Sequence, residues 1–126
     1  MRLSLVATAA LALAAADAAR GSDAAQPIAE IVTFRLVPGS DVEAFLAAAA
    51  GMTPFLDSTG AALSRSLSAD DTGLWTDYIT WSSMAAAKTA ADAMMARPEA
   101  APFMELIDPD TVVLRHAPIL FSIPPE

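Results

Sequence analysis

The chain has no cysteine among its 126 residues, only one histidine and only one lysine. Without cysteine there can be no disulfide, no thiolate metal site and no cysteine nucleophile. His116 alone cannot form the multi-histidine sets that hold zinc. The fold must therefore be held together by packing, and the sequence predicts neither a metal site nor thiol chemistry.

Basic residues and glycines are also scarce. Seven Lys and Arg against 15 Asp and Glu give a formal net charge of -8. Nucleic-acid binding needs clustered Lys and Arg, so nucleic acid is not a predicted partner. The five glycines form no G-x-G-x-x-G segment, so no flavin or nicotinamide site is expected. We predict a protein without a cofactor.

The amino terminus has the pattern of a secretory signal peptide. Arg2 precedes an apolar run from Leu3 to Ala16, and the small-residue triplet Ala16-Asp17-Ala18 follows. The run is shorter than the roughly 20 residues that span a bilayer. We therefore expect cleavage after Ala18 and a periplasmic or secreted mature protein with no membrane span.

The remaining chain has room for one domain. We expect residues 1–18 to be the signal peptide and residues 19–27 to be a polar linker. Residues 28–120 then form the folded domain, and residues 121–126 form a C-terminal tail.

The first half of this domain is predicted to be a strand followed by a helix. Residues 28–37 are rich in β-branched and aromatic side chains and end at a Pro-Gly pair, which favours a strand. Ser40 and Glu43 have the spacing of a capping box at the start of a helix. Pro54 should kink this helix or begin a separate turn. The apolar stripe of the helix consists of Val42, Phe45, Leu46 and Ala49.

The second half is predicted to be a hairpin, a helix and a final strand. Residues 62–82 contain two strands joined by Asp-Asp-Thr-Gly, a turn of the hairpin type. Ser82 or Ser83 can cap the helix that follows, and residues 110–120 form the last strand after a brief helical turn. The order is βαββαβ, the ferredoxin-like arrangement of the α+β class. The helix has an apolar stripe of Met84, Ala87, Ala91, Met94 and Met95, with Lys88, Thr89 and Asp92 outside it.

Large apolar side chains are expected on both faces of the sheet. In the third strand Trp75, Ile79 and Trp81 face one way, whereas Leu74 and Tyr78 face the other. Helices cover only one face of the sheet in this fold. If the other face were open to water, apolar and polar side chains should alternate more regularly along the strands. A second copy packed sheet on sheet would cover the open face and close a two-fold symmetric barrel. We therefore expect a homodimer.

Three segments carry a resemblance to a known family: Trp-Thr-Asp in the third strand, Ala-Ala-Pro-Phe-Met-Glu-Leu-Ile-Asp-Pro at 100–109, and Arg-His-Ala in the last strand. Over about residues 28–120 the chain resembles the antibiotic biosynthesis monooxygenase-like (ABM-like) dimeric α/β barrel proteins, and most closely an uncharacterised bacterial branch. The resemblance implies a ferredoxin-like protomer and a shared-sheet dimer. Some members of the family oxidise aromatic polyketides or quinols without a cofactor, and others break down haem, so the resemblance also implies one of these activities. Many members have a histidine in the helix after Trp81, and this helix has none.

His116 and Asp77 are the candidate catalytic residues. His116 shares a strand face with Val112 and Leu114, and an imidazole facing an apolar cavity can take a phenolic proton near neutral pH. Its alternative role is that of a hydrogen-bonded structural histidine. A buried Asp77 needs Arg65, Arg35 or His116 as a partner. It then either orients the imidazole or forms a structural ion pair.

Trp75, Tyr78 and Arg65 are the candidate ligand-binding residues. Residues 75 and 78 point to opposite faces of one strand, so only one of the two rings can line a given cavity. Trp81 is expected to pack in the core against the second helix.

Three functional classes fit these features. The first is an exported, cofactor-independent monooxygenase acting on a small aromatic or quinone. The second is a periplasmic small-ligand-binding protein without chemistry, and the third is a structural or stress-related dimer. A cavity on the order of a few hundred Å³ separates the first two from the third. A base within reach of the ligand separates the first from the second.

Overall fold

A computed structural model describes residues 26–125 of the chain. The expected signal peptide and most of the expected linker lie outside the described residues. Within residues 26–125, no helix is long and apolar enough to cross a membrane.

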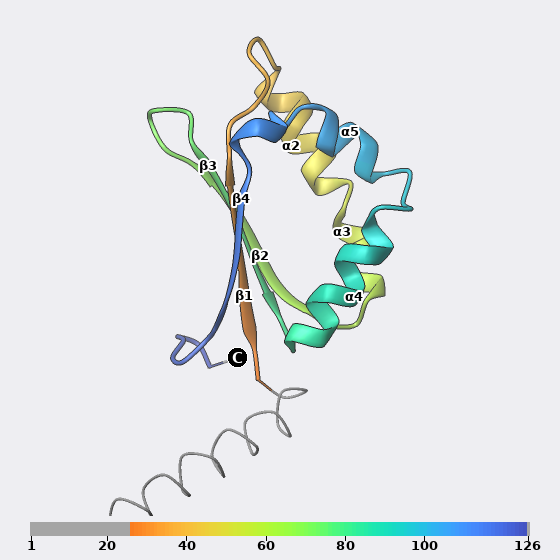
Figure 1. The fold of residues 1–126 in the computed structure, drawn as a ribbon, viewed down its shortest axis with the longest axis vertical. Coiled ribbons are helices and arrows are strands. Elements are labelled where there is room, and N and C mark those ends of the chain that lie inside the picture. Colours follow the sequence, from red (N-terminus) through yellow and green to blue (C-terminus); the bar gives the residue numbers. More distant parts are fainter. Residues whose placement is uncertain (1–25, 126) are drawn as a thin grey trace, which may run out of the picture.

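Four strands form a single antiparallel sheet (Figure 1). Strands β1 (Ile28–Phe34) and β3 (Trp75–Trp81) lie in its centre, and β2 (Ala62–Ala69) and β4 (Val113–Pro118) are its edges. The strand order is β2-β3-β1-β4. This topology confirms the predicted ferredoxin-like α+β fold.

The helices form one layer on one face of the sheet (Figure 1). Helices α2 (Val42–Ala50) and α3 (Thr53–Ser58) connect β1 to β2. Helices α4 (Met84–Met94) and α5 (Ala100–Glu105) and the short 3-10 turn η2 (Pro109–Thr111) connect β3 to β4. The face of the sheet that points toward this layer is called the inner face, and the opposite one the outer face.

The start of α2 differs from the predicted capping box. Asp41, not Ser40, is the N-cap, because the Asp41 carboxylate accepts the Glu43 N–H at 3.0 Å while the Ser40 hydroxyl donates to the Val37 carbonyl. Aspartate caps a helix about as well as serine does. Pro54 lies at the start of α3, so the second of its two predicted outcomes is correct.

The start of α4 confirms one of the two predicted caps, since the Ser83 hydroxyl accepts the Ala86 N–H at 3.1 Å. The predicted apolar stripe is correct at Ala87, which is buried. It is wrong at Met95, which is 78% exposed. Met95 is the C-cap residue of α4, one position beyond the helix end at Met94.

The outer face is less apolar than the sequence predicts. Leu74 lies outside the strands, because β3 begins at Trp75, and the strand predicted over residues 28–37 ends earlier, at Phe34. The strand pairing leaves mostly hydroxyl-bearing side chains on this face, together with a few apolar ones. The outer-face residues are Ala29, Ile31, Thr33, Ser64, Ser66, Ser68, Thr76, Tyr78, Thr80, Val113, Arg115 and Ala117.

The core fills one end of the space between the inner face and the helices. Its centre is an aromatic cluster of Phe34, Phe45, Trp75 and Phe103. The Phe45 ring centroid lies 5.7 Å from that of Phe34, 5.0 Å from that of Trp75 and 5.3 Å from that of Phe103. Trp81 is also buried in the core, as predicted.

Candidate functional site

A cavity of about 560 Å³ lies between the inner face of the sheet and the helix layer. This volume falls within the usual range for small-molecule sites. The protein's own side chains therefore leave space for a ligand. Most of the lining is apolar, including Val32, Ile79, Leu114, Met94, Phe103 and Ile107.

One row of side chains crosses the cavity floor from one edge of the sheet to the other. Arg65 on β2 pairs with Ile79 on β3, Ile79 pairs with Glu30 on β1, and Glu30 pairs with His116 on β4. Directly paired residues share a face, and all four side chains line the cavity. Three interstrand spacings of about 4.8 Å make the row about 14 Å long.

His116 forms its side-chain contact with Glu30 at the β4 end of this row. The His116 Nε2 atom lies 3.1 Å from Glu30 Oε1, and the two side chains are 22% and 17% exposed. A carboxylate can only accept, so Nε2 carries the hydrogen that it donates. In the neutral imidazole, Nδ1 then keeps the lone pair and is the nitrogen able to accept a proton.

Asp77 is 5% exposed, and of the partners that the sequence allows it pairs with Arg65. Arg65 Nε donates to Asp77 Oδ1 at 3.0 Å and Nη2 donates to Oδ2 at 2.7 Å, a bidentate geometry. The structure does not bring Asp77 into hydrogen-bonding contact with His116. The prediction of a structural ion pair therefore matches the observed contacts, and the imidazole has Glu30 as its partner.

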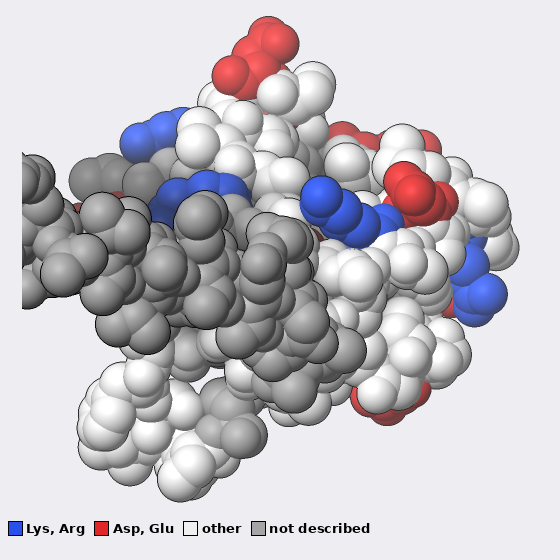
Figure 2. Space-filling model, turned by 60° about the horizontal axis from the view of Figure 1, so that its bottom comes forward, with Lys and Arg blue, Asp and Glu red and all other residues white. Residues whose placement is uncertain are grey.

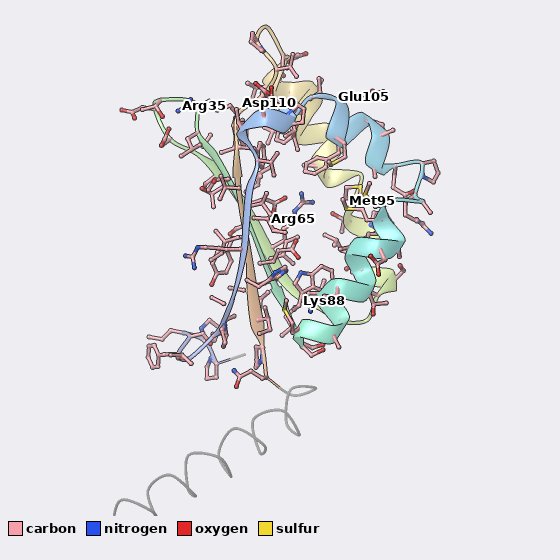
Figure 3. All side chains as sticks on the ribbon, viewed as in Figure 1. Arg35, Arg65, Lys88, Met95, Glu105 and Asp110 are labelled. Carbon is pink, nitrogen blue, oxygen red and sulfur yellow. The ribbon has the colours of Figure 1, made fainter. Side chains whose placement is uncertain are left out.

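Arg65 also reaches the helix layer. Its Nη1 donates to the Ala49 carbonyl at the end of α2 at 2.9 Å, and its Cζ lies 5.3 Å from the Phe103 ring centroid. Figure 3 shows Arg65 in the space between the sheet and the helices. Arg65 therefore connects the two layers and lines the cavity, and its contact with a ligand stays a prediction.

Neither predicted aromatic ligand contact lines the cavity. Trp75 is on the inner face, but its ring is buried against Phe34, with centroids 6.5 Å apart, and against Phe45. Tyr78 is on the outer face and exposed. The aromatic cluster fills the end of the space where Trp75 lies, and of its four rings only Phe34 and Phe103 line the cavity.

Glu30 is not predicted as a site residue from the sequence, although the position of its carboxylate in the first strand is a signal. Strand alternation places it on the same face as Ile28, Val32 and Phe34, where a carboxylate is unexpected. Its partner His116 is 86 residues away. Only the β1–β4 register brings the two side chains together.

Lys88 and Asp92 line the cavity from α4, although the sequence places them outside the apolar stripe. The buried residues of α4 are Ala87, which belongs to the predicted stripe, and Ala90, which does not. Because α4 covers a cavity rather than a filled core, the polar side chains next to its apolar stripe also line the cavity.

The cavity opens at the β4 edge of the sheet. Leu114 lines it from β4 and is nevertheless 55% exposed, and Val112 and Met104 beside it are also exposed. Here the lining side chains contact water as well as the cavity. A ligand can therefore enter between β4 and α5.

The charged groups of the cavity lining do not gather into a metal site or a basic surface. Within residues 26–125, no group of three or more His, Asp and Glu is placed to hold a metal ion. On the face shown in Figure 2, the Lys and Arg residues that are not covered by undescribed atoms lie as separate groups and form no continuous basic patch.

Several solved structures share this fold. A variant of SnoaB, a cofactor-independent oxygenase from Streptomyces nogalater, is 16% identical with a TM-score of 0.61, covering 80% of this chain and 100% of that one. A candidate antibiotic biosynthesis monooxygenase from Bordetella bronchiseptica is 16% identical with a TM-score of 0.61, covering 76% and 99%. Protein SO0527 from Shewanella oneidensis is 17% identical with a TM-score of 0.57, covering 75% and 92%.

The TM-scores establish a shared fold, and they confirm the predicted structural resemblance to ABM-like proteins. No protein-family model and no curated protein sequence matches the chain.

Proposed function

We propose that this chain is an ABM-like, cofactor-independent monooxygenase that oxidises a small phenol or quinol in the cavity. The observation that carries the proposal is the cavity of about 560 Å³ with His116 on its floor, where Glu30 leaves Nδ1 as the proton acceptor. This combination provides room for a flat organic molecule and a base beside it.

The reaction begins with transfer of the phenolic proton to His116 Nδ1. The resulting phenolate is rich enough in electrons to reduce O₂ directly. One oxygen atom forms the new carbonyl at the ring position opposite the hydroxyl, and the other leaves as water with the phenolic and ring hydrogens. The sum is phenol plus O₂ giving quinone plus water, a four-electron oxidation that needs no further reductant.

The protein contributes the base, the orientation of the ring and an apolar surrounding. Val32, Ile79 and Leu114 are the apolar side chains of the floor, beside Glu30 and His116. Such a floor holds an aromatic ring in a fixed position and reduces the water around the phenolate.

Oxygen consumption with 1-naphthol tests the proposal. The protein should convert 1-naphthol to 1,4-naphthoquinone, and ¹⁸O₂ should place one labelled atom in the quinone and one in water. His116→Gln should lower turnover about 10²–10⁴-fold, the usual loss when a general base is removed. Equal oxygen uptake by the wild type and the variant would contradict the assignment of His116.

Ligand binding without chemistry is the second candidate function. It is favoured by the open mouth at β4, where exposed Leu114 admits water to the site. In this case 1-naphthol would bind with a measurable Kd and no oxygen would be consumed.

We further propose that the protein is a homodimer. Exposed apolar side chains continue from β4 into the C-terminal segment, and a second copy would cover them. Native mass spectrometry should report twice the protomer mass, and a strict monomer at micromolar concentration would contradict this. The apolar residues concerned are Val113, Leu120, Phe121 and Ile123.

We also propose export to the periplasm or beyond. The support is the order of Arg2, the apolar run and the triplet ending at Ala18. The mature protein from its native host should begin at or near Ala19, and replacing Ala18 with a bulky residue should leave the precursor uncut. Full-length protein in the cytosol would contradict export.

A further inference from the structure

A second hollow of about 430 Å³ lies along β2, beside α2 and α3. Leu63 and Leu46 border it and are exposed, so this hollow is an open groove. Of all the residues that line the groove, only Leu56 and Arg65 also line the inner cavity. These two side chains therefore form the wall between the groove and the cavity.

Arg65 is held firmly in this wall. Three of its N–H groups donate to protein acceptors, two of them to Asp77 and one to the Ala49 carbonyl. Its side chain is only 17% exposed. A ligand that pushed Arg65 aside would leave the Asp77 carboxylate buried without its partner, which is strongly unfavourable.

We propose that Arg65 and Leu56 determine specificity by limiting the length of the ligand. His116 and Arg65 are the two ends of the same row across the floor. A phenol with its hydroxyl at His116 lies across the strands, and its apolar body can extend only as far as the wall, within about 14 Å. The inference rests on the proposed ligand-binding function and adds the substrate class: phenols whose apolar body is no longer than this row.

The affinity of 4-alkylphenols, from ethyl to decyl, measures the position of the wall. While the chain lengthens inside the cavity, each added CH₂ should tighten binding about fourfold, equivalent to about 0.8 kcal/mol. Once the chain reaches Arg65, a further carbon can be buried only by pushing the ring away from His116 toward the mouth, so it adds no affinity. The plot of log Kd against chain length, measured by calorimetry, should then become flat.

Two variants open the wall by different routes. Arg65→Ala combined with Asp77→Leu removes the ion pair without leaving a buried charge unpaired. Leu56→Ala removes the apolar part and leaves the ion pair in place. In both variants the flat part of the plot should begin at a longer chain, because the cavity then continues into the groove. Leu63→Ala is the matched control, since Leu63 lines the groove only and should leave the break unchanged.

The possible results distinguish a failure of the wall proposal from a failure of the proposed function. A break at the same chain length in the wild type and in both folded variants, checked by circular dichroism, overturns the wall while ligand binding stands. If alkylphenols bind with the expected shift but 1-naphthol, whose ring position opposite the hydroxyl carries a hydrogen, is not oxidised, the wall stands and the oxygenase proposal fails. If no alkylphenol binds to the wild type, both fail.

Discussion

His116 Nε2 lies 3.1 Å from Glu30 Oε1, a contact between the edge strand β4 and the central strand β1 at directly paired positions. The carboxylate decides which nitrogen carries the hydrogen. It also limits rotation of the ring, because the ring must keep Nε2 toward Glu30. Glu30 is thus a positioning residue for the proposed base.

Glu30→Gln should lower kcat for 1-naphthol and leave KM nearly unchanged. The amide can donate as well as accept, so it no longer requires Nε2 to be the donor. The loss should be smaller than the roughly 10²–10⁴-fold loss on removing the base itself. Glu43→Gln, an exposed change on α2, is the control and should have no effect. An unchanged kcat in Glu30→Gln would show that the contact is only structural.

Arg65→Ala should destabilise the fold by about 3–5 kcal/mol, because it leaves the buried Asp77 carboxylate unpaired. Replacing the pair together, as in Arg65→Met with Asp77→Leu, should recover most of this loss. Urea denaturation of the three proteins measures the difference. Arg97→Ala is the control: Arg97 pairs with Glu99 at the surface, and its loss should cost less than about 1 kcal/mol.

Replacing Trp75 and replacing Tyr78 should affect the stability of the fold differently, but neither should change ligand binding much. Trp75→Ala removes a ring from the aromatic cluster and should cost about 3–5 kcal/mol. Tyr78→Ala changes an exposed outer-face residue and should cost much less. Neither change should alter the Kd of 1-naphthol in folded protein by more than about twofold. A large loss of affinity in Tyr78→Ala would mean that the ligand binds at the outer face.

Asp70 should give the hairpin between β2 and β3 a stability that depends on pH. Its carboxylate accepts the Thr72 hydroxyl at 2.6 Å, the Leu74 N–H at 3.0 Å and the Thr72 N–H at 2.8 Å. The Thr72 hydroxyl, followed by the two backbone N–H groups, lowers the pKa of Asp70 below its ordinary value.

Because the pKa of Asp70 is lower in the folded than in the unfolded protein, its ionised carboxylate stabilises the fold. This stabilisation is fully present above the unfolded pKa of about 3.9 and is lost as the pH falls through the folded pKa. Asp70→Asn should therefore be less stable than the wild type at pH 6, and the two should converge at lower pH. Urea midpoints between pH 2.5 and pH 7 measure this. Asp71→Asn, which changes a neighbouring carboxylate that accepts none of these bonds, should run parallel to the wild type. A constant gap between Asp70→Asn and the wild type would exclude ionisation as the cause.

The sequence by itself determined the elements and the faces of the strands. Strand alternation placed His116 with Val112 and Leu114, and all three line the cavity. Capping chemistry and apolar periodicity placed the helices, with an error of one residue at Asp41. These features depend on residues that are close together in the sequence, so local sequence patterns are enough to predict them.

Only the tertiary structure decided which side chains meet. The sequence allowed Asp77 three partners, and the β2–β3 register selected Arg65. The β1–β4 register joined His116 to Glu30. The cavity depends on how far the helix layer stands from the sheet, and the packing of Phe45 and Phe103 on Trp75 fills one end and leaves the other open. Register and layer spacing arise from contacts between distant segments, so no local pattern in the sequence could reveal them.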